Sequence, residues 1–284
     1  MSMTGKNAHT LAVPGATLYY EVSGSGPVLL MIPGGPVDAD AFVDQARLLG
    51  DRYTVVRYDP RGLSRSALDR PPDELSIETQ ADDAHRLLAA MGSEPAYVFG
   101  TSGGAQVGLS LAASHPEQVD TLVAHEPPAA ELLPDSVQHR TFPREVYDIY
   151  KREGVGPAMG TFLARVGMGG GQEPAGPPSD PPPEAQEAMA RMQRNVEFWL
   201  AHTFLGIGTF VPDIAALRSA SSRVVVAVGQ ETEGLLIQCG RALAERLGTQ
   251  PVTFPGDHGG FNGQPAAFAE KLDQVLRGGR TPAP

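Results

Sequence analysis

The residues best suited to chemistry are centred on a serine between glycines. Gly100-Thr101-Ser102-Gly103-Gly104 follows a short apolar run, residues 96–99, and opens a helical pattern over residues 105–114. A serine on a sharp turn from strand to helix is exposed, and glycines are needed around it because side chains there would collide. We therefore predict that Ser102 is a nucleophile held on such a turn.

A second glycine turn, at residues 31–36, ends an earlier apolar run with Pro33-Gly34-Gly35-Pro36. Attack on a carbonyl group places negative charge on oxygen, which requires backbone N–H donors already in position. The residue after the serine supplies one donor and a turn of this kind supplies the other. Since Pro36 has no N–H, we predict an oxyanion hole formed by Gly35 and Gly103.

A loop histidine is the expected general base. His258 follows the apolar run at 251–254 within Gly256-Asp257-His258-Gly259-Gly260. A histidine that leaves the last strand in a flexible loop can point back over the sheet toward the serine, and the chain order of serine before histidine is the expected one. We predict that His258 takes the proton of Ser102.

Two carboxylates are candidates for the acid that orients His258. Glu126 follows the run at 119–124 and precedes two prolines, whereas Glu231 follows the run at 223–229. The prolines restrict the chain after Glu126 and can fix its carboxylate in place. We favour Glu126 and keep Glu231 as the alternative acid.

Composition limits the classes of function. The 284 residues carry a net charge of −11 and one cysteine, Cys239, so neither a nucleic-acid partner, a membrane partner nor an internal disulfide is expected. The N-terminus lacks the apolar core of a signal peptide, and we predict a soluble, cytoplasmic protein. The sequence has no group of His, Cys, Asp and Glu at ligand spacing. We therefore expect no metal and no cofactor.

The apolar pattern alternates strands with helices. A hairpin at 9–13 and 16–22 precedes predicted strands at 28–32, 53–58, 96–99, 119–124, 223–229 and 251–254, with helices near 38–49, 76–91, 103–114, 234–247 and 265–277. This alternation predicts an α/β fold with a mostly parallel central sheet covered by helices on both faces. Ligands bind at the carboxyl ends of such strands, where each candidate residue falls.

Residues 131–210 are expected to form a helical insertion in a core of residues 1–130 and 211–284. The insertion has helical patterns near 142–153, 156–166 and 184–204, and a Gly/Pro-rich loop at 167–183. Its last helix carries an apolar stripe with a period of three to four residues. From this stripe and the strand end we expect three substrate-pocket residues: Met192, Trp199 and Pro128.

The chain resembles the α/β-hydrolases over nearly its whole length apart from the insertion. The resemblance is carried by Gly34-Gly35, by Tyr58-Asp59-Pro60-Arg61-Gly62-Leu63-Ser64-Arg65-Ser66, by the turn at Ser102 and by Gly256-Asp257-His258. It implies the α/β-hydrolase fold with a helical cap, and it implies that Asp59, Arg61 and Ser64 brace a loop. The sequence departs from the family at Pro33, a position before the oxyanion-loop glycines where the family usually has a histidine.

The ending His125-Glu126-Pro127 also resembles the fungal zearalenone lactonases, and this likeness implies a triad of Ser102, Glu126 and His258. The resulting hypothesis is a cofactor-free serine hydrolase that cleaves an ester or lactone of a mainly apolar small molecule. A C–C bond hydrolase, a proline aminopeptidase-like enzyme and a perhydrolase remain open on the same triad, as does a ligand-binding receptor. The sequence leaves open the natural substrate and whether the protein forms a homodimer.

Overall fold

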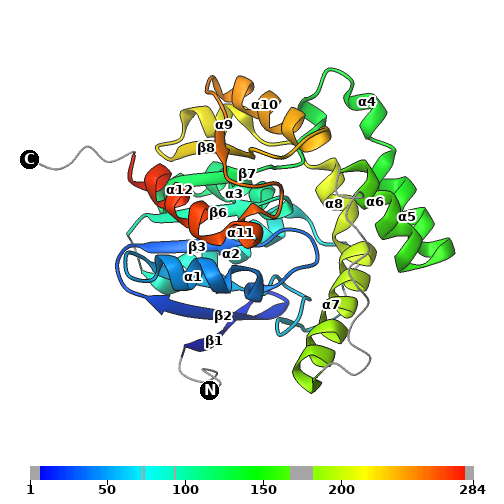
Figure 1. The fold of residues 1–284 in the computed structure, drawn as a ribbon, viewed down its shortest axis with the longest axis horizontal. Helices are drawn as coiled ribbons and strands as arrows, with labels where there is room; N and C mark the ends of the chain where they lie inside the picture. The colour runs from blue at the N-terminus through cyan, green and yellow to red at the C-terminus, as the bar shows by residue number, and fades with distance from the viewer. Residues whose placement is uncertain (1–6, 71, 73, 93, 167–181, 279–284) are drawn as a thin grey trace, which may run out of the picture.

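A computed structural model describes residues 7–70, 72, 74–92, 94–166 and 182–278. Within them, one sheet has the strand order β1-β2-β4-β3-β6-β7-β8-β9, with β5 paired to β2 (Figure 1). The strands are β1 Ala8–Val13, β2 Ala16–Gly24, β3 Val28–Ile32, β4 Thr54–Tyr58, β5 Ala67–Leu68, β6 Ala96–Thr101, β7 Val119–His125, β8 Arg223–Gly229 and β9 Val252–Phe254. The predicted strands are confirmed.

Pairing in the sheet is antiparallel at one end and parallel through the rest. β1 pairs with β2, and β2 with β4, in antiparallel register. From β4 through β3, β6, β7 and β8 to β9, every pair is parallel. The carboxyl ends of these strands therefore meet at one edge, which is where the candidate site residues were predicted.

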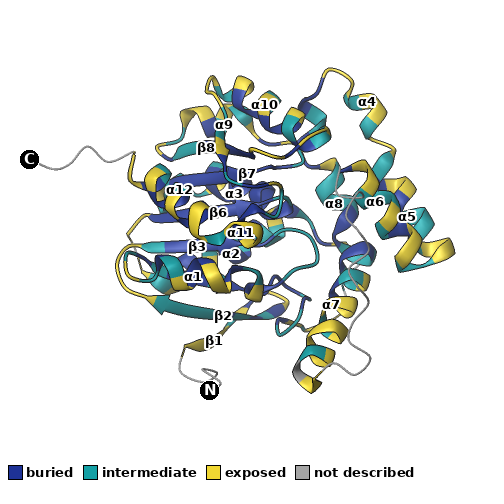
Figure 2. Cartoon of the chain, viewed as in Figure 1, coloured by how far each residue is buried: buried dark blue, intermediate teal, exposed yellow. Residues whose placement is uncertain are grey.

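Helices cover both faces of the sheet because side chains alternate between the faces along each strand. Leu30 and Val98 belong to the core beneath α2 (Ile77–Met91), α3 (Gly103–Ser114) and α10 (Leu235–Leu247). Leu29 and Phe99 belong to the core beneath α1 (Val43–Leu49) and α12 (Pro265–Arg277). Figure 2 shows the buried residues following the central strands. The chain has the predicted α/β-hydrolase architecture.

Among the described residues between β7 and α9 (Ile214–Ser219), five α-helices are grouped beside the sheet in Figure 1. They are α4 Ser136–His139, α5 Phe142–Glu153, α6 Val155–Arg165, α7 Pro183–His202 and α8 Phe204–Thr209. Helices α5 to α8 pack on one another around Val146, Ala158, Trp199, Leu200 and Phe204. Ile207 of α8 packs against both this cluster and a core of the sheet, and so connects the two.

Some helix boundaries differ from those expected. The helix predicted at 38–49 begins as a 3-10 turn at Ala39–Phe42. The helix predicted at 184–204 is divided at Thr203, which lies between α7 and α8 with a φ of −117°. Periodicity does not detect such breaks because apolar spacing continues across them. The predicted loop at 167–183 lies almost entirely outside the described residues. Among the helices that are described, none has the length and apolar character needed to cross a membrane.

Candidate active site

Ser102 occupies the sharp turn between β6 and α3. Its φ of 54° and ψ of −125° are strained for a residue with a side chain. The adjoining glycines permit the turn, since a Cβ on Gly104 would lie 2.3 Å from the Ile32 carbonyl oxygen and one on Gly100 would lie 2.4 Å from the Gly104 carbonyl oxygen. The Ser102 amide donates a hydrogen bond of 2.8 Å to the His125 carbonyl. The serine is therefore fixed by backbone contacts on both sides.

The turn after β3 packs closely against Ser102. A Cβ on Gly34 would lie 2.2 Å from the Thr101 carbonyl oxygen, so a side chain there would separate the two turns. Gly35 has a φ of 65°, and its amide nitrogen lies 3.9 Å from where a Cβ on Gly103 would stand. The amides of Gly35 and Gly103, the predicted oxyanion donors, are thus on adjacent turns.

Glu126 is the carboxylate that the structure brings to His258. It directly follows β7 with a φ of 49° and is 0% exposed. Its Oε1 accepts a hydrogen bond of 2.7 Å from the Gly229 amide, and its Oε2 lies 2.5 Å from Nδ1 of His258. With its proton on Nδ1 donated to Glu126, the imidazole presents Nε2 as a base.

The charge of Glu126 is stabilised despite its burial. Burial raises the pKa of this carboxyl group, but the hydrogen bond from His258 and the electrostatic interactions with His125 and His258 outweigh it, so that the pKa falls to about 2. Glu126 is therefore an anion across the neutral range and can hold His258 in one tautomer.

Glu231, the alternative acid, makes different contacts. Its Oε1 accepts a hydrogen bond of 3.0 Å from Gln264 on the protein surface, and its amide donates to the Gly256 carbonyl at 2.9 Å. Glu231 lies in the loop after β8, and its carboxylate is thus held by the exposed amide side chain of Gln264. Of the two candidates, the structure unites Glu126, and not Glu231, with His258.

Sequence reasoning assigned no role to His125. Its side chain is fully buried, with Nδ1 3.0 Å from Thr101 Oγ1 and its ring centroid 6.2 Å from that of His258. Burial lowers its pKa to about 4, so the ring is neutral behind the anionic Glu126. The available signal was a titratable residue directly after the apolar run Leu122-Val123-Ala124.

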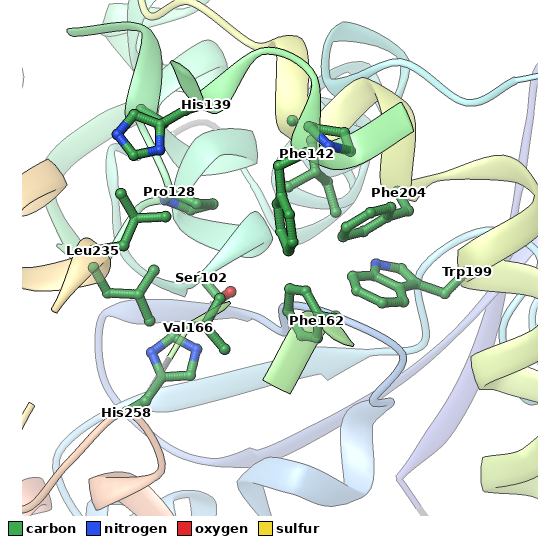
Figure 3. Close-up of a pocket in the computed structure, with 16 residues that line it drawn as sticks. Ser102, Pro128, His139, Phe142, Phe162, Val166, Trp199, Phe204, Leu235 and His258 are labelled. Carbon is green, nitrogen blue, oxygen red and sulfur yellow. The ribbon is translucent and has the colours of Figure 1, made fainter. Parts of the chain in front are cut away.

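Ser102 and His258 line one pocket, shown in Figure 3. Two of the predicted pocket residues, Trp199 and Pro128, also line it. Side chains that sequence analysis did not identify complete most of the wall, and they are Phe142, Pro143, Phe162, Val166, Phe204, Ile207, Leu235 and Leu236. Several lay in predicted helices, but periodicity does not say which of two apolar neighbours a helix faces. The result is a mainly apolar, aromatic pocket.

The prediction for Met192 was wrong. It is 42% exposed and is not among the residues lining the pocket with Trp199. Seven residues of helix separate the two side chains, so they share a face of α7 but stand about 10 Å apart along its axis. The predicted apolar stripe on α7 reaches the pocket at Trp199. Its first part, including the 50% exposed Met189, lies beyond the pocket.

Among the described residues, two buried nitrogen atoms of pocket-lining side chains have no hydrogen-bond partner, namely the indole Nε1 of Trp199 and Nε2 of His139. Nδ1 of His139 lies 3.0 Å from Arg165 Nη2, and because arginine only donates, this nitrogen is the acceptor. The His139 proton is thus on Nε2, which lies 3.4 Å from Asp135 Oδ1. Both nitrogen atoms are buried from solvent, so the surface that the pocket presents is mainly apolar.

Acid is expected to destabilise the fold in two stages. The pKa of His125 is about 4 in the folded protein against 6.5 in an unfolded chain. The pKa of Glu126 is about 2 in the folded protein against 4.5 in an unfolded chain. In both cases the unfolded chain binds more protons, so stability is full above the unfolded value and is lost as pH falls through the folded one. We expect urea midpoints to decline first between pH 6.5 and 4 and further between pH 4.5 and 2.

Variants separate the two stages of this acid destabilisation. His125→Asn should flatten the upper part of the pH dependence, and Glu126→Gln should flatten the lower part, because each variant removes one titrating group. Urea unfolding of the wild type and both variants across the acid range measures this. If the variants follow the wild-type pH dependence, these two groups do not cause the loss.

Comparison with known proteins agrees with this geometry. The sequence profile of the alpha/beta hydrolase fold family matches residues 27–169. The chain is 36% identical over 279 residues to the uncharacterized hydrolase YraK of Bacillus subtilis (strain 168), covering 95% of this chain and 96% of that protein.

Two solved structures share the fold over nearly the whole chain. A thermophilic esterase from Thermogutta terrifontis has a TM-score of 0.74 and 24% identity, covering 97% of this chain and 99% of its own. The enol-lactonase from Burkholderia xenovorans LB400 has a TM-score of 0.69 and 19% identity, covering 94% of this chain and 99% of its own. The resemblance to zearalenone lactonases stays a prediction. The family profile and the match to YraK show that the chain belongs to the alpha/beta hydrolase fold family.

Proposed function

We propose that the protein is a serine hydrolase that cleaves an ester or lactone bond of a mainly apolar small molecule through an acyl-enzyme. The observation that carries this proposal is the strained Ser102 in the pocket wall beside His258, whose Nδ1 is held by buried Glu126. Backbone strain concentrates at functional sites, and this serine is held in strain by contacts on both sides.

The proposed reaction has two halves. Ser102 Oγ attacks the carbonyl carbon while His258 Nε2 takes its proton, and the amides of Gly35 and Gly103 stabilise the negative oxygen. His258 then gives the proton to the leaving alkoxide. In the second half, water activated by His258 attacks the acyl-enzyme and releases the acid and Ser102. In a lactone, both products remain one molecule because acyl group and alcohol are joined.

The helices α4–α8 are proposed to act as a cap formed by residues 131–210 over a core of residues 1–130 and 211–284. The cap supplies Phe142, Phe162, Trp199 and Phe204 to the pocket, while the core supplies Ser102 and His258. An apolar wall with few polar groups favours an apolar ligand and uses those groups for orientation.

A fluorophosphonate probe tests this function directly, since it reacts with activated serines. We expect one adduct on native protein, mapped to Ser102, and none on heat-denatured protein, because activation depends on His258 and Glu126 in place. Intact mass and peptide mapping give the stoichiometry and the site. Ester and lactone panels follow a positive result. A native protein that is never labelled would contradict the proposal and favour a ligand-binding protein.

A further inference from the structure

Ser64 is strained although it lies outside the proposed triad. Among the described residues, three that are not glycine have positive φ, namely Ser64, Ser102 and Glu126. Two of them belong to the proposed catalytic group. Ser64 has a φ of 50° and lies in the loop after β4. It is one of the residues that the family resemblance implies brace this loop. Such a conformation persists only where surrounding contacts fix it, so the contacts of Ser64 indicate what it does.

Those contacts connect Ser64 to helix α7. The Ser64 amide donates a hydrogen bond of 2.8 Å to Oδ1 of Asn195, and Nδ2 of Asn195 donates one of 2.8 Å to Ser64 Oγ. Ser64 Oγ in turn donates to Asp38 Oδ2 at 2.5 Å. Asn195 is only 2% exposed. Removing either member of this reciprocal pair leaves buried polar groups without partners, which is costly.

The same face of α7 makes further contacts with the core. Arg191, one turn before Asn195, donates to Asp38 Oδ2 at 3.1 Å and to Asp40 Oδ2 at 2.6 Å. On the following turn, the ring of Phe198 packs so closely over Gly62 that a Cβ there would lie 2.1 Å from it. Spacings of four and three residues align these side chains along one side of the helix.

This row of contacts joins two parts of the proposed active site. Asp38 lies three positions after Gly35, a proposed oxyanion donor, in the same segment. Asn195 stands one helical turn before Trp199, a wall of the pocket. The position of α7, and with it the indole of Trp199, is therefore tied to the segment that carries Gly35.

We propose that Ser64, Asn195, Arg191 and Asp38 form a latch that holds α7 on the core and fixes Trp199 as a wall of the pocket. Asn195 and Ser64 are positioning residues, which act on substrate through Trp199. For its effect on substrate selection the inference rests on the proposed hydrolase function. The latch itself is a structural claim and can be tested without turnover.

Fluorescence gives that test, because Trp199 is the one tryptophan among the 284 residues. Its 2% exposure predicts blue-shifted emission that acrylamide quenches weakly. In Asn195→Ala we expect a red shift and an increase of about twofold or more in the quenching constant, as the lost hydrogen bonds free α7. Alanine is the better helix former, so helix propensity does not account for such a change.

A matched control and a second variant make the result decisive. Gln193→Ala changes an exposed residue of the same helix and should leave the emission of Trp199 as in the wild type. Ser64→Gly removes the hydroxyl while glycine accepts the positive φ. It keeps the amide bond to Asn195 Oδ1, so it should shift the emission and quenching in the same direction as Asn195→Ala but by a smaller amount, even if Asn195→Ala fails to fold. A folded Asn195→Ala or Ser64→Gly protein with wild-type emission and quenching overturns the latch.

Kinetics tests the consequence for substrate choice. With esters of a short and a bulky acyl group, we expect Asn195→Ala to raise KM for the bulky ester about fivefold or more, with a smaller change in kcat and little effect on the short ester. An equal effect on both esters overturns the role in substrate positioning. If the wild type hydrolyses neither esters nor lactones, the proposed function has failed, and the fluorescence result still tests the latch.

Discussion

Ser102→Ala is expected to lower kcat for ester hydrolysis by a factor of about 10⁴ to 10⁶, because the proposed attacking oxygen is gone and only binding and oxyanion stabilisation remain. The fold should persist, since the turn is held by backbone contacts, among them the bond from the Ser102 amide to the His125 carbonyl. Initial rates with circular dichroism of the same sample measure both. Activity near the wild-type value would exclude Ser102 as the nucleophile.

Ser102→Gly is the companion variant, and it separates chemistry from stability. Glycine adopts the φ of 54° without the penalty that a side chain imposes. We therefore expect activity to be lost as in Ser102→Ala, while the free energy of unfolding rises by about 1 kcal/mol relative to Ser102→Ala. Urea unfolding measures the difference. A glycine variant less stable than the alanine variant would show that the turn stores no strain.

Glu126→Gln is expected to lower kcat by a factor of about 10⁴ through loss of the correct histidine tautomer. The two carboxylate oxygens each face a donor, the Gly229 amide at 2.7 Å and His258 Nδ1 at 2.5 Å. An amide has one oxygen for these two donors, so its NH₂ group must oppose one of them. Steady-state kinetics against pH tests this, with a loss in kcat rather than KM as the expected signature.

Glu231→Gln is the control for that experiment. It makes the same chemical change in the same type of side chain, but its partner is the exposed Gln264. We expect kcat within about twofold of the wild type, since an exposed hydrogen bond contributes little. A large loss in Glu231→Gln with a small loss in Glu126→Gln would reverse the assignment of the acid.

Sequence was sufficient for features that depend on local pattern. The turn at Ser102 stands between an apolar run and a helical pattern, and this local setting carried the prediction. The alternation of strands and helices places the ends of β6, β7 and β9 at one edge of the sheet. The preference for Glu126 over Glu231 came from proline stiffness close to the residue. In each case the physical cause lies within a few residues of the side chain concerned.

Features that depend on distant packing could not be predicted. The exposure of Met192 follows from how far α7 extends beyond the pocket, which its periodicity does not encode. The bonds between Ser64 and Asn195 join residues 131 positions apart, and neither residue type is unusual in a loop or a helix. His125 is inconspicuous in sequence because its special property, a neutral ring, is produced by complete burial.

In the proposed triad the carboxylate follows β7, so the segment beyond β8 supplies no proposed catalytic side chain. At the end of β8, the backbone amide of Gly229 donates a hydrogen bond to Glu126. Residues 230–234 then lead directly into α10, which begins with Leu235 and Leu236 in the pocket wall. Changes of length or composition in this segment can therefore reshape the substrate pocket while the reactive group is preserved. In the proposed enzyme, the reacting residues and this part of the pocket wall therefore lie on separate segments of the chain.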